Sequence, residues 1–383
     1  MLGSELYLAL QERIPQFHCF GIVGDTMERS GIERVAHIDE LSVMGVSDVL
    51  RHVAAIRMLE SRLVTLIERK KPRFAVLIDN PGFHFRLGEQ LRLRGIKVFQ
   101  YVAPKLWAWG EGRVSKIRSS FDEVLGVLPF EEDFFRSRGV SYTYVGSPVK
   151  DRVDKVMVSR RALGIAEKKI VITCLPGSRV SEIKLNLPLI HTIAQQVRAV
   201  LPETVFLTPM AQNLRDHVFA DALGLSHLAP WVEPQDGVPF RHSMTGELCL
   251  IRGMSLESMA ASDAAIVASG TATLECGLLG TPMIVVYKMS DFSYQIAKKM
   301  VKIPYVSLVN LMAGREVVKE YIQEFLIEDA VADVIRLVTD QHVRKEMTLA
   351  FEEIRDQLDG CAAVRAAERI VSQVLPKGRE AGS

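Results

Sequence analysis

Short apolar runs alternate along most of this chain with longer stretches in which apolar residues recur every three or four positions. The short runs predict buried strands, and the longer stretches predict amphipathic helices. Their regular alternation is typical of α/β folds with parallel sheets. The predicted strands occupy residues 18–23, 74–78, 98–102, 123–127 and 142–145 in the first half, and 170–175, 205–207, 264–267 and 283–286 in the second. The predicted helices include 5–13, 47–69 and 88–94, with further helices within 316–374.

The alternation is interrupted around Gly146-Ser147-Pro148 and starts again near Ile170. A chain of 383 residues is long for one hydrophobic core, so two doubly wound domains in tandem are the natural interpretation. We place these domains at residues 1–160 and 161–345, and expect helices at 346–383 to pack back toward the N-terminal domain.

The beginning of the chain departs from this pattern. A doubly wound domain normally opens with a strand and a phosphate-binding turn, whereas this sequence opens with a predicted helix. The first strand of the N-terminal domain is therefore expected to be missing from the sequence.

The composition describes a well-packed globular protein, with 48% hydrophobic and 24% charged residues. A net charge of +1 gives no reason to expect nucleic acid as a partner. Five scattered cysteines without paired spacing fit free thiols in a reducing cytoplasm. No uncharged run reaches the roughly 18 residues of a membrane span, so we expect any membrane contact to be peripheral.

The segment from Val267 to Pro282 has the layout of a nucleotide-diphosphate pocket. An apolar strand runs into Ser269-Gly270-Thr271, where small residues let a diphosphate approach the backbone. A helix that begins near Thr271 points free N–H groups at the phosphates. Glu275, one turn farther in, could accept hydrogen bonds from ribose hydroxyls. Alternatively, Ser269 and Thr271 only cap a helix and Glu275 is solvated.

A second phosphate-binding candidate opens the second half, where a predicted strand ends in Leu175-Pro176-Gly177-Ser178-Arg179. Gly177 permits close backbone approach, Ser178 can hydrogen-bond an oxygen, and the planar guanidinium of Arg179 suits phosphate. The alternative is that Arg179 only pairs with Glu182, three residues farther along the helix.

Asp79 follows a strand as apolar as Ala75–Ile78, which places its carboxylate at the mouth of the sheet, partly desolvated and suited to act as a general base. It could equally cap the next helix. His84 is a competing base, although a single histidine beside two phenylalanines is more often structural.

The segment Tyr101–Trp109, followed by Arg113 and Lys116, is a third candidate. Its two tryptophans and the basic residues could form a face for a lipid phosphate, or the rings could belong to the core beside a solvated basic helix. The apolar segment Glu40–Val46 could line an acyl-chain groove or simply pack.

Taken together, these segments resemble the lipid-A-disaccharide synthase family of GT-B glycosyltransferases. The resemblance extends from about Leu2 to Val374. It is carried by ELSVMG at 40–45, LIDNPGF at 77–83, YVAPKLWAW at 101–109, LPFEEDFF at 128–135, LPGSR at 175–179, ASGTATLE at 268–275 and YVSLVNLMAGR at 305–315.

The resemblance implies a GT-B fold, in which two Rossmann-like domains face a cleft. It implies inverting transfer of a 2,3-diacylglucosamine unit from its UDP-sugar to 2,3-diacylglucosamine 1-phosphate (lipid X), which gives UDP and the β-1,6-linked precursor of lipid A. By motif, Asp79 falls on the general base for the acceptor 6-hydroxyl, and Arg179 and Asn310 fall on active-site positions. Ser269, Thr271 and Glu275 fall in the donor-nucleotide region.

The resemblance also places the protein peripherally on the cytoplasmic face of the inner membrane of a Gram-negative bacterium, and it admits a homodimer. No cofactor is expected, because the UDP-sugar is a substrate. No metal is expected either, because the sequence has no Asp-x-Asp pair and an arginine with a helix N-terminus can stabilise the departing UDP.

Three positions depart from the family pattern. Gly82 stands where many relatives have a second acidic residue, and Ser147 stands where a histidine is common. The family also has a strand and a Gly-Glu-(Thr/Ser)-Ser-Gly-Asp turn just before the residues that match Leu2-Gly3. We therefore expect the stated start, Met1, to lie downstream of the real one, and an upstream extension to complete the site.

Two other functional interpretations stay open. One is a different GT-B enzyme that uses a UDP-sugar, such as a UDP-N-acetylglucosamine 2-epimerase. The other is an inactive paralogue that binds a nucleotide or a lipid.

Overall fold

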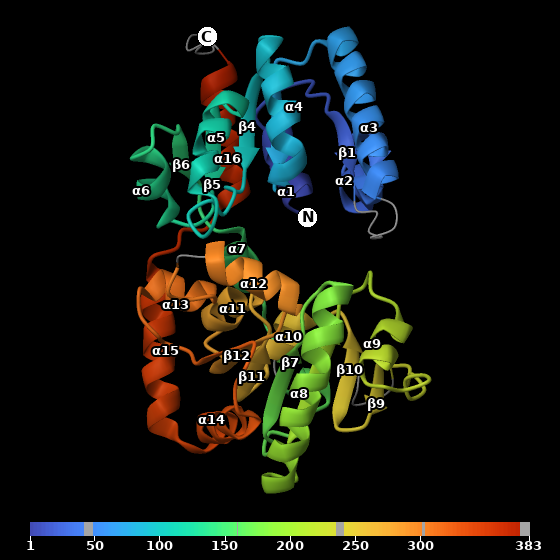
Figure 1. The fold of residues 1–383 in the computed structure, drawn as a ribbon, viewed down its shortest axis with the longest axis vertical. Helices are drawn as coiled ribbons and strands as arrows, with labels where there is room; N and C mark the ends of the chain where they lie inside the picture. Colours follow the sequence, from blue (N-terminus) through green and yellow to red (C-terminus); the bar gives the residue numbers. More distant parts are fainter. Residues whose placement is uncertain (42–48, 159, 235–240, 301–302, 376–383) are drawn as a thin grey trace, which may run out of the picture. The chain divides into compact units, whose positions relative to one another are not determined.

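The chain is represented by a computed structural model that describes residues 1–41, 49–158, 160–234, 241–300 and 303–375 (Figure 1). It divides into two compact units. Unit 1 consists of Met1–Pro148 and Leu358–Ser383, and unit 2 consists of Val149–Gln357.

Unit 1 carries two parallel sheets, β1-β2 and β3-β4-β5-β6. In the described residues β1 pairs with β2 alone and β3 pairs with β4 alone, so the parallel strands do not form one continuous sheet. Its elements are α1 (Leu2–Gln11), β1 (Phe20–Val23), α2 (Asp25–Arg29), β2 (Glu33–His37), η1 (Ile38–Leu41), α3 (Val49–Lys70), β3 (Phe74–Ile78), α4 (Pro81–Leu93), β4 (Lys97–Tyr101), η3 (Glu111–Arg113), α5 (Val114–Ser120), β5 (Glu123–Gly126), α6 (Glu131–Arg136), β6 (Tyr142–Tyr144) and α16 (Ala362–Val374).

Helices cover both faces of the four-stranded sheet. Leu87 and Leu91 of α4 and Ile117 of α5 belong to the core on one face. On the other face Leu6 and Leu10 of α1, one turn apart and therefore on one side of that helix, pack with α16. The last helix of the chain is thus part of unit 1.

Unit 2 is built around a seven-stranded sheet of order β13-β12-β11-β7-β8-β10-β9, parallel except for the pairing of β10 with β9. Its elements are α7 (Pro148–Val153), η4 (Arg160–Leu163), β7 (Val171–Leu175), α8 (Val180–Val200), β8 (Val205–Met210), α9 (Asp216–Ala222), β9 (His242–Thr245), β10 (Leu248–Arg252), α10 (Ser255–Ala260), β11 (Ala264–Val267), α11 (Thr271–Leu278), β12 (Met283–Tyr287), α12 (Asp291–Met300), α13 (Leu308–Ala313), β13 (Glu320–Ile322), α14 (Ile327–Thr339) and α15 (Gln341–Asp356).

The α/β class and the two doubly wound units confirm the fold predicted from the sequence. The boundaries differ from the prediction, because the units divide at 148/149 and 357/358 instead of 160/161 and 345/346. Helix α15 packs on α11 and α14 of unit 2, so of the predicted C-terminal helices only α16 joins unit 1. In the described part of the chain no helix is long and apolar enough to cross a membrane.

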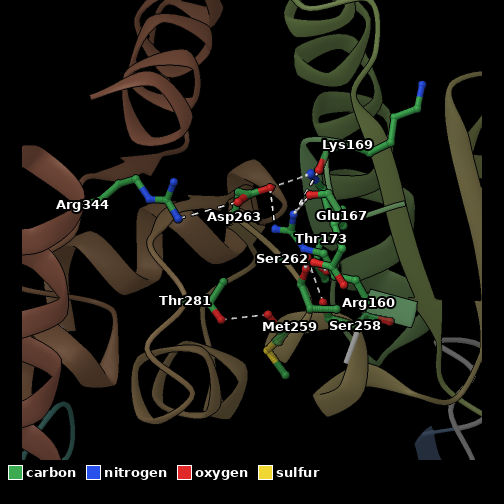
Figure 2. A network of polar contacts seen from close by, with 12 residues as sticks. Arg160, Glu167, Lys169, Thr173, Ser258, Met259, Ser262, Asp263, Thr281 and Arg344 are labelled. Atoms are coloured by element: carbon green, nitrogen blue, oxygen red, sulfur yellow. Dashed lines mark hydrogen bonds and ion pairs between the residues drawn. The ribbon is translucent and has the colours of Figure 1, made fainter. Parts of the chain in front are cut away.

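The segment that precedes β7 is fixed to unit 2 by Arg160 (Figure 2). Its guanidinium donates to the carbonyl oxygens of Ala261 (2.9 Å), Glu167 (3.1 Å) and Lys169 (3.1 Å). It also forms an ion pair with Asp263 at 2.7 Å, and the same carboxylate accepts from Val171 N at 2.9 Å. One planar fork therefore links the segment before β7 to the start of β11, which explains why the boundary lies before residue 160.

We expect Arg160→Met to lower the free energy of unfolding by about 1 to 3 kcal/mol, because it removes the closest cation from the partly buried Asp263 carboxylate and leaves three carbonyls without this donor. Arg160→Lys should recover only part of this, since an ammonium cannot reproduce the fork. Urea unfolding measures the difference. Arg161→Met is the control: Arg161 is an exposed neighbour, so a change there beyond about 0.5 kcal/mol would contradict this account.

A buried carboxyl group organises the Trp107 loop of unit 1. Trp107 Nε1 donates to Glu131 at 2.8 Å, and Tyr142 Oη lies 2.9 Å from Leu128 O and 3.0 Å from the other oxygen of Glu131. Tyr142 has one hydroxyl proton, so both of its contacts are satisfied when it donates to Leu128 and accepts from a protonated Glu131. Burial raises the pKa of Glu131 from 4.5 to about 7, against the lowering effect of these hydrogen bonds.

Because the pKa of Glu131 is higher in the folded state, the folded protein binds more protons than the unfolded chain between pH 4.5 and about 7. Its contribution to stability therefore falls as pH rises through that window. Glu131→Gln keeps an acceptor for Trp107 and a donor for Tyr142 without a charge. We expect the melting temperature of this variant to increase relative to that of the unmodified chain as pH rises. Over the whole window, the difference between their free energies of unfolding should change by roughly 3 kcal/mol at most.

The neighbouring Glu132 provides the control for this pH effect. It pairs with Arg136 at 2.6 Å and is more exposed than Glu131. Glu132→Gln should follow the unmodified chain across the pH range. A Glu131→Gln variant whose stability keeps a constant difference from the unmodified chain would mean that Glu131 titrates normally.

Candidate functional site

Two turns lie next to each other at one edge of the sheet in unit 2, because the strands that lead into them are paired. In the parallel pair β7 and β11, Val267 lies opposite Leu175, and Ala268 N donates to Leu175 O at 2.7 Å. The chain runs from β7 to β8 on one side and returns to β11 on the other, so the strand order reverses between the turns. Open α/β sheets bind ligands at such a reversal.

The first turn contains Gly177, Ser178 and Arg179. Gly177 has φ of +116°, and a Cβ there would lie 2.6 Å from Glu182, so the turn requires glycine. Glu182 accepts hydrogen bonds from Ser178 N at 2.9 Å and Arg179 N at 3.2 Å, and pairs with the Arg179 guanidinium at 2.7 Å. The pairing considered from the sequence is therefore present, while the Arg179 side chain remains 69% exposed at the strand ends.

The second turn contains Ser269, Gly270 and Thr271. Thr271 is exposed and begins α11, whose first N–H groups have no acceptor within the helix and so face the same sheet edge. Ser269 Oγ donates to Val306 O at 3.0 Å, which ties the turn to the segment before α13. Thr271 and the backbone of this turn are thus better placed to meet an anion than the Ser269 hydroxyl.

Glu275 lies on α11 but is buried, and its carboxylate binds Arg152 at 2.7 Å. Burial raises the pKa of Glu275, and the Arg152 cation opposes that shift. The carboxylate predicted to meet ribose hydroxyls is here occupied by an ion pair. Arg152 was not identified from the sequence, since 123 residues separate the partners.

Asn310 is completely buried and uses its whole amide within the protein. Its nitrogen donates to Val318 O and to Glu320 at 2.8 Å each, and its oxygen accepts from Val317 N at 2.7 Å and Val318 N at 2.9 Å. Glu320 in turn accepts from Ser307 N at 2.9 Å. In this arrangement Asn310 shapes the segment beside the Ser269 turn, and its side chain is not free to meet a substrate.

Asp79 in unit 1 lies at the end of β3 in a strained turn. Asp79, Asn80 and Val102 have φ of +57°, +39° and +70°, a region that side-chain-bearing residues rarely adopt, least of all a β-branched valine. Gln100, fully buried, holds this arrangement, because its amide nitrogen donates to Asp79 O at 3.0 Å and Val102 O at 3.1 Å. Strain of this kind is concentrated at functional sites.

The Asp79 side chain itself is exposed, so the partial desolvation expected from the sequence is not seen. The competing base, His84, is buried against Phe83, with ring centroids 5.9 Å apart. Burial lowers the pKa of His84 to about 4, against the raising effect of Gln100 and Asp79. A buried imidazole of that pKa is a weak and inaccessible base, which leaves Asp79 as the better candidate.

The two tryptophans of the third cluster have different surroundings. Trp107 is turned toward Glu131 by its N–H group. Trp109 is 45% exposed, and the Arg113 guanidinium lies 4.7 Å from its ring centroid. Trp109 and Arg113 are thus placed as the predicted lipid-phosphate face requires, and Lys116 on α5 is exposed, whereas Trp107 is turned inward. The segment Glu40–Val46, with Met44, lies mostly outside the described residues.

Comparison with known proteins identifies a family. The family model for lipid-A-disaccharide synthetase matches residues 1–374. The lipid-A-disaccharide synthase of Myxococcus xanthus is 36% identical over 382 residues, which cover 98% of this chain and 95% of that protein.

Solved structures with low sequence identity show the same fold. The glycotransferase of kitacinnamycin matches with a TM-score of 0.60 at 15% identity, covering 98% of this chain and 97% of its own. A UDP-GlcNAc 2-epimerase from Neisseria meningitidis, bound to UDP-GlcNAc, matches with a TM-score of 0.59 at 14% identity over 97% and 96% of the two chains. These likenesses place the fold among GT-B proteins, and the family match over nearly the whole length shows that this chain belongs to the lipid-A-disaccharide synthases, which are hexosyltransferases of lipid A biosynthesis.

Proposed function

We propose that this chain joins UDP-2,3-diacylglucosamine to 2,3-diacylglucosamine 1-phosphate by inverting transfer, with unit 2 binding the nucleotide and unit 1 activating the acceptor. The observation that carries the proposal is the hydrogen bond between Ala268 N and Leu175 O, which sets the Gly177–Arg179 and Ser269–Thr271 turns side by side. Together they offer a guanidinium and helix N–H groups to one diphosphate.

The chemistry balances with one base and one leaving group. The Asp79 carboxylate takes the proton of the acceptor 6-hydroxyl as that oxygen attacks the anomeric carbon of the donor sugar. The bond from that carbon to the diphosphate oxygen breaks, and UDP leaves with the electron pair. Arg179 and the first turn of α11 stabilise the charge that develops on the diphosphate.

The acyl chains of both substrates support a peripheral position on a cytoplasmic membrane surface, since such lipids stay in the bilayer. The Trp109–Arg113 pair supports the same position, because an aromatic ring and a cation suit the boundary between acyl chains and headgroups. Independence from a metal and a homodimeric state stay predictions. No observation in the site favours epimerase chemistry over glycosyl transfer.

Asp79→Asn should lower the turnover number by roughly 10² to 10⁴, because the amide cannot accept the hydroxyl proton. The affinity for UDP should not change, since Asp79 lies in the other unit. Disaccharide formation measured by mass spectrometry and UDP titration by calorimetry test the two parts. Glu89→Gln, an exposed change on α4, is the matched control and should retain full activity. Full turnover by Asp79→Asn would remove the base assignment.

Gln100→Leu tests the strained turn as a positioning device. Loss of the amide leaves the Asp79 and Val102 carbonyls without their donor, so the free energy of unfolding should fall by about 1 to 3 kcal/mol. Turnover per folded molecule should also fall, by roughly 10²-fold if Asp79 moves by an ångström, with unchanged UDP affinity. A variant that loses stability but keeps its turnover per folded molecule would show that Gln100 has no role beyond folding.

A further inference from the structure

Helix α12, Asp291–Met300, does not bury any of its ten side chains, all of which are described. It nevertheless carries large apolar residues. The exposed fractions of Phe292, Ile296 and Met300 are 78%, 43% and 45%. Packing in the core of the protein therefore does not explain why these three positions carry apolar side chains.

The three apolar residues form one stripe. They are spaced four residues apart, and at about 100° per residue they fall within an arc of roughly 80° on the helix surface. The partly buried Tyr294 lies on the opposite side of the helix, and the partly buried Ala297 lies on its flank. The stripe thus points away from the core of unit 2 along the whole length of α12.

The polar residues of α12 are cationic toward its end. Lys298 and Lys299 occupy the last turn and are exposed. Asp291 is the one acidic residue of the helix, and its carboxylate accepts from Gln323 Nε2 at 3.0 Å. At 100° per residue Lys299 lies beside the stripe, next to Phe292, whereas Lys298 lies on the side of Tyr294. The helix therefore presents an apolar stripe with a cation, Lys299, at its border, a combination that suits the interface of an anionic bilayer.

The position of α12 fits such a surface. It follows β12, which pairs with β11, so it emerges from the same edge of the sheet as the Ser269–Thr271 turn. A lipid-linked donor bound at that turn would extend its acyl chains near this edge. Of the observations on α12, only this nearness to a bound lipid donor rests on the proposed function.

A second copy of the chain is a poorer occupant. The three side chains expose roughly 300 Å², whereas a stable interface takes about 800 Å² from each partner. Two identical basic stripes would also repel each other. A bilayer has neither difficulty, since it needs only shallow insertion.

We propose that α12 is an interfacial helix that docks unit 2 on the surface of a bilayer containing anionic lipids. Phe292, Ile296 and Met300 enter the boundary between headgroups and acyl chains, and Lys299 contacts lipid phosphates. The helix spans about 15 Å, lies along the surface and does not cross the membrane.

The test is cosedimentation of the full chain with vesicles of phosphatidylcholine alone, or of equal parts phosphatidylcholine and phosphatidylglycerol. Replacing Phe292, Ile296 and Met300 together by serine should lower partitioning into both vesicles roughly tenfold or more. Replacing Lys299 by glutamine should lower partitioning into the anionic vesicles by about fivefold and leave the neutral vesicles unaffected. Lys298→Gln, on the opposite side of the helix, should have a smaller effect.

Met157, Leu326 and Leu349 provide the matched control. These three apolar residues of unit 2 lie outside α12 and are 94%, 67% and 50% exposed. Their triple replacement by serine should leave vesicle binding unchanged. The proposal is overturned if the unmodified chain does not bind the vesicles, or if the α12 and control variants bind equally. It is also overturned if the α12 changes alter only how the molecular mass of the protein in solution depends on its concentration, since that would indicate self-association.

A separate readout distinguishes this proposal from the proposed function. UDP affinity and disaccharide formation are measured with substrates dispersed in detergent, where no bilayer is needed. The α12 variants should retain both. If the unmodified chain bound vesicles through α12 but made no disaccharide, the proposed function would fail and the docking surface would stand.

Discussion

The parallel pairing of β7 with β11 is the constraint on which the candidate site depends. β7 begins the seven-stranded sheet, and β11 returns beside it after β8, β9 and β10 have formed the other side. The hydrogen bond from Ala268 N to Leu175 O then aligns two turns that are 90 residues apart in sequence. A shift of this register by one residue would move the side chains of β11 to the opposite face of the sheet and would separate the two turns.

The two units position the segments of the candidate site in different ways. Unit 2 uses polar networks: Arg160 fixes the segment before β7, and Asn310 fixes the segment beside the second turn. Unit 1 holds Asp79 in a strained turn, whose cost Gln100 offsets with two hydrogen bonds, to Asp79 O and Val102 O. Strain persists only where surrounding contacts determine the backbone, and the fully buried Gln100 supplies that determination.

Sequence periodicity located several strands that are buried on both faces, such as Val171–Leu175 and Ala264–Val267, because their apolar runs have no helical interpretation of that length. It missed β2, β9, β10 and β13: the short β13 is only partly buried, and β9 alternates buried with more exposed residues. The two turns and Asp79 were found because they follow apolar runs. The sequence does not show that the side chains of Glu275 and Asn310 are already paired within the protein, since their partners Arg152 and Glu320 reach them through tertiary packing alone.

The hydrogen bonds of Glu182 determine which donors of the first turn a phosphate would have to compete for. This carboxylate accepts from Ser178 N, from Arg179 N and from the Arg179 guanidinium, which are the donors that the first turn would offer to an anion. A diphosphate that used all three would leave a carboxylate unsatisfied beside two new negative charges, at a cost that charge-assisted hydrogen bonds make substantial. In the first turn of α11 no described carboxylate competes in this way, since Glu275 faces Arg152, although Thr273 N donates to Gly270 O at 3.2 Å. For the proposed function, the arrangement that these contacts favour is therefore a diphosphate anchored on α11, for which the exposed Arg179 guanidinium exchanges Glu182 for the phosphate.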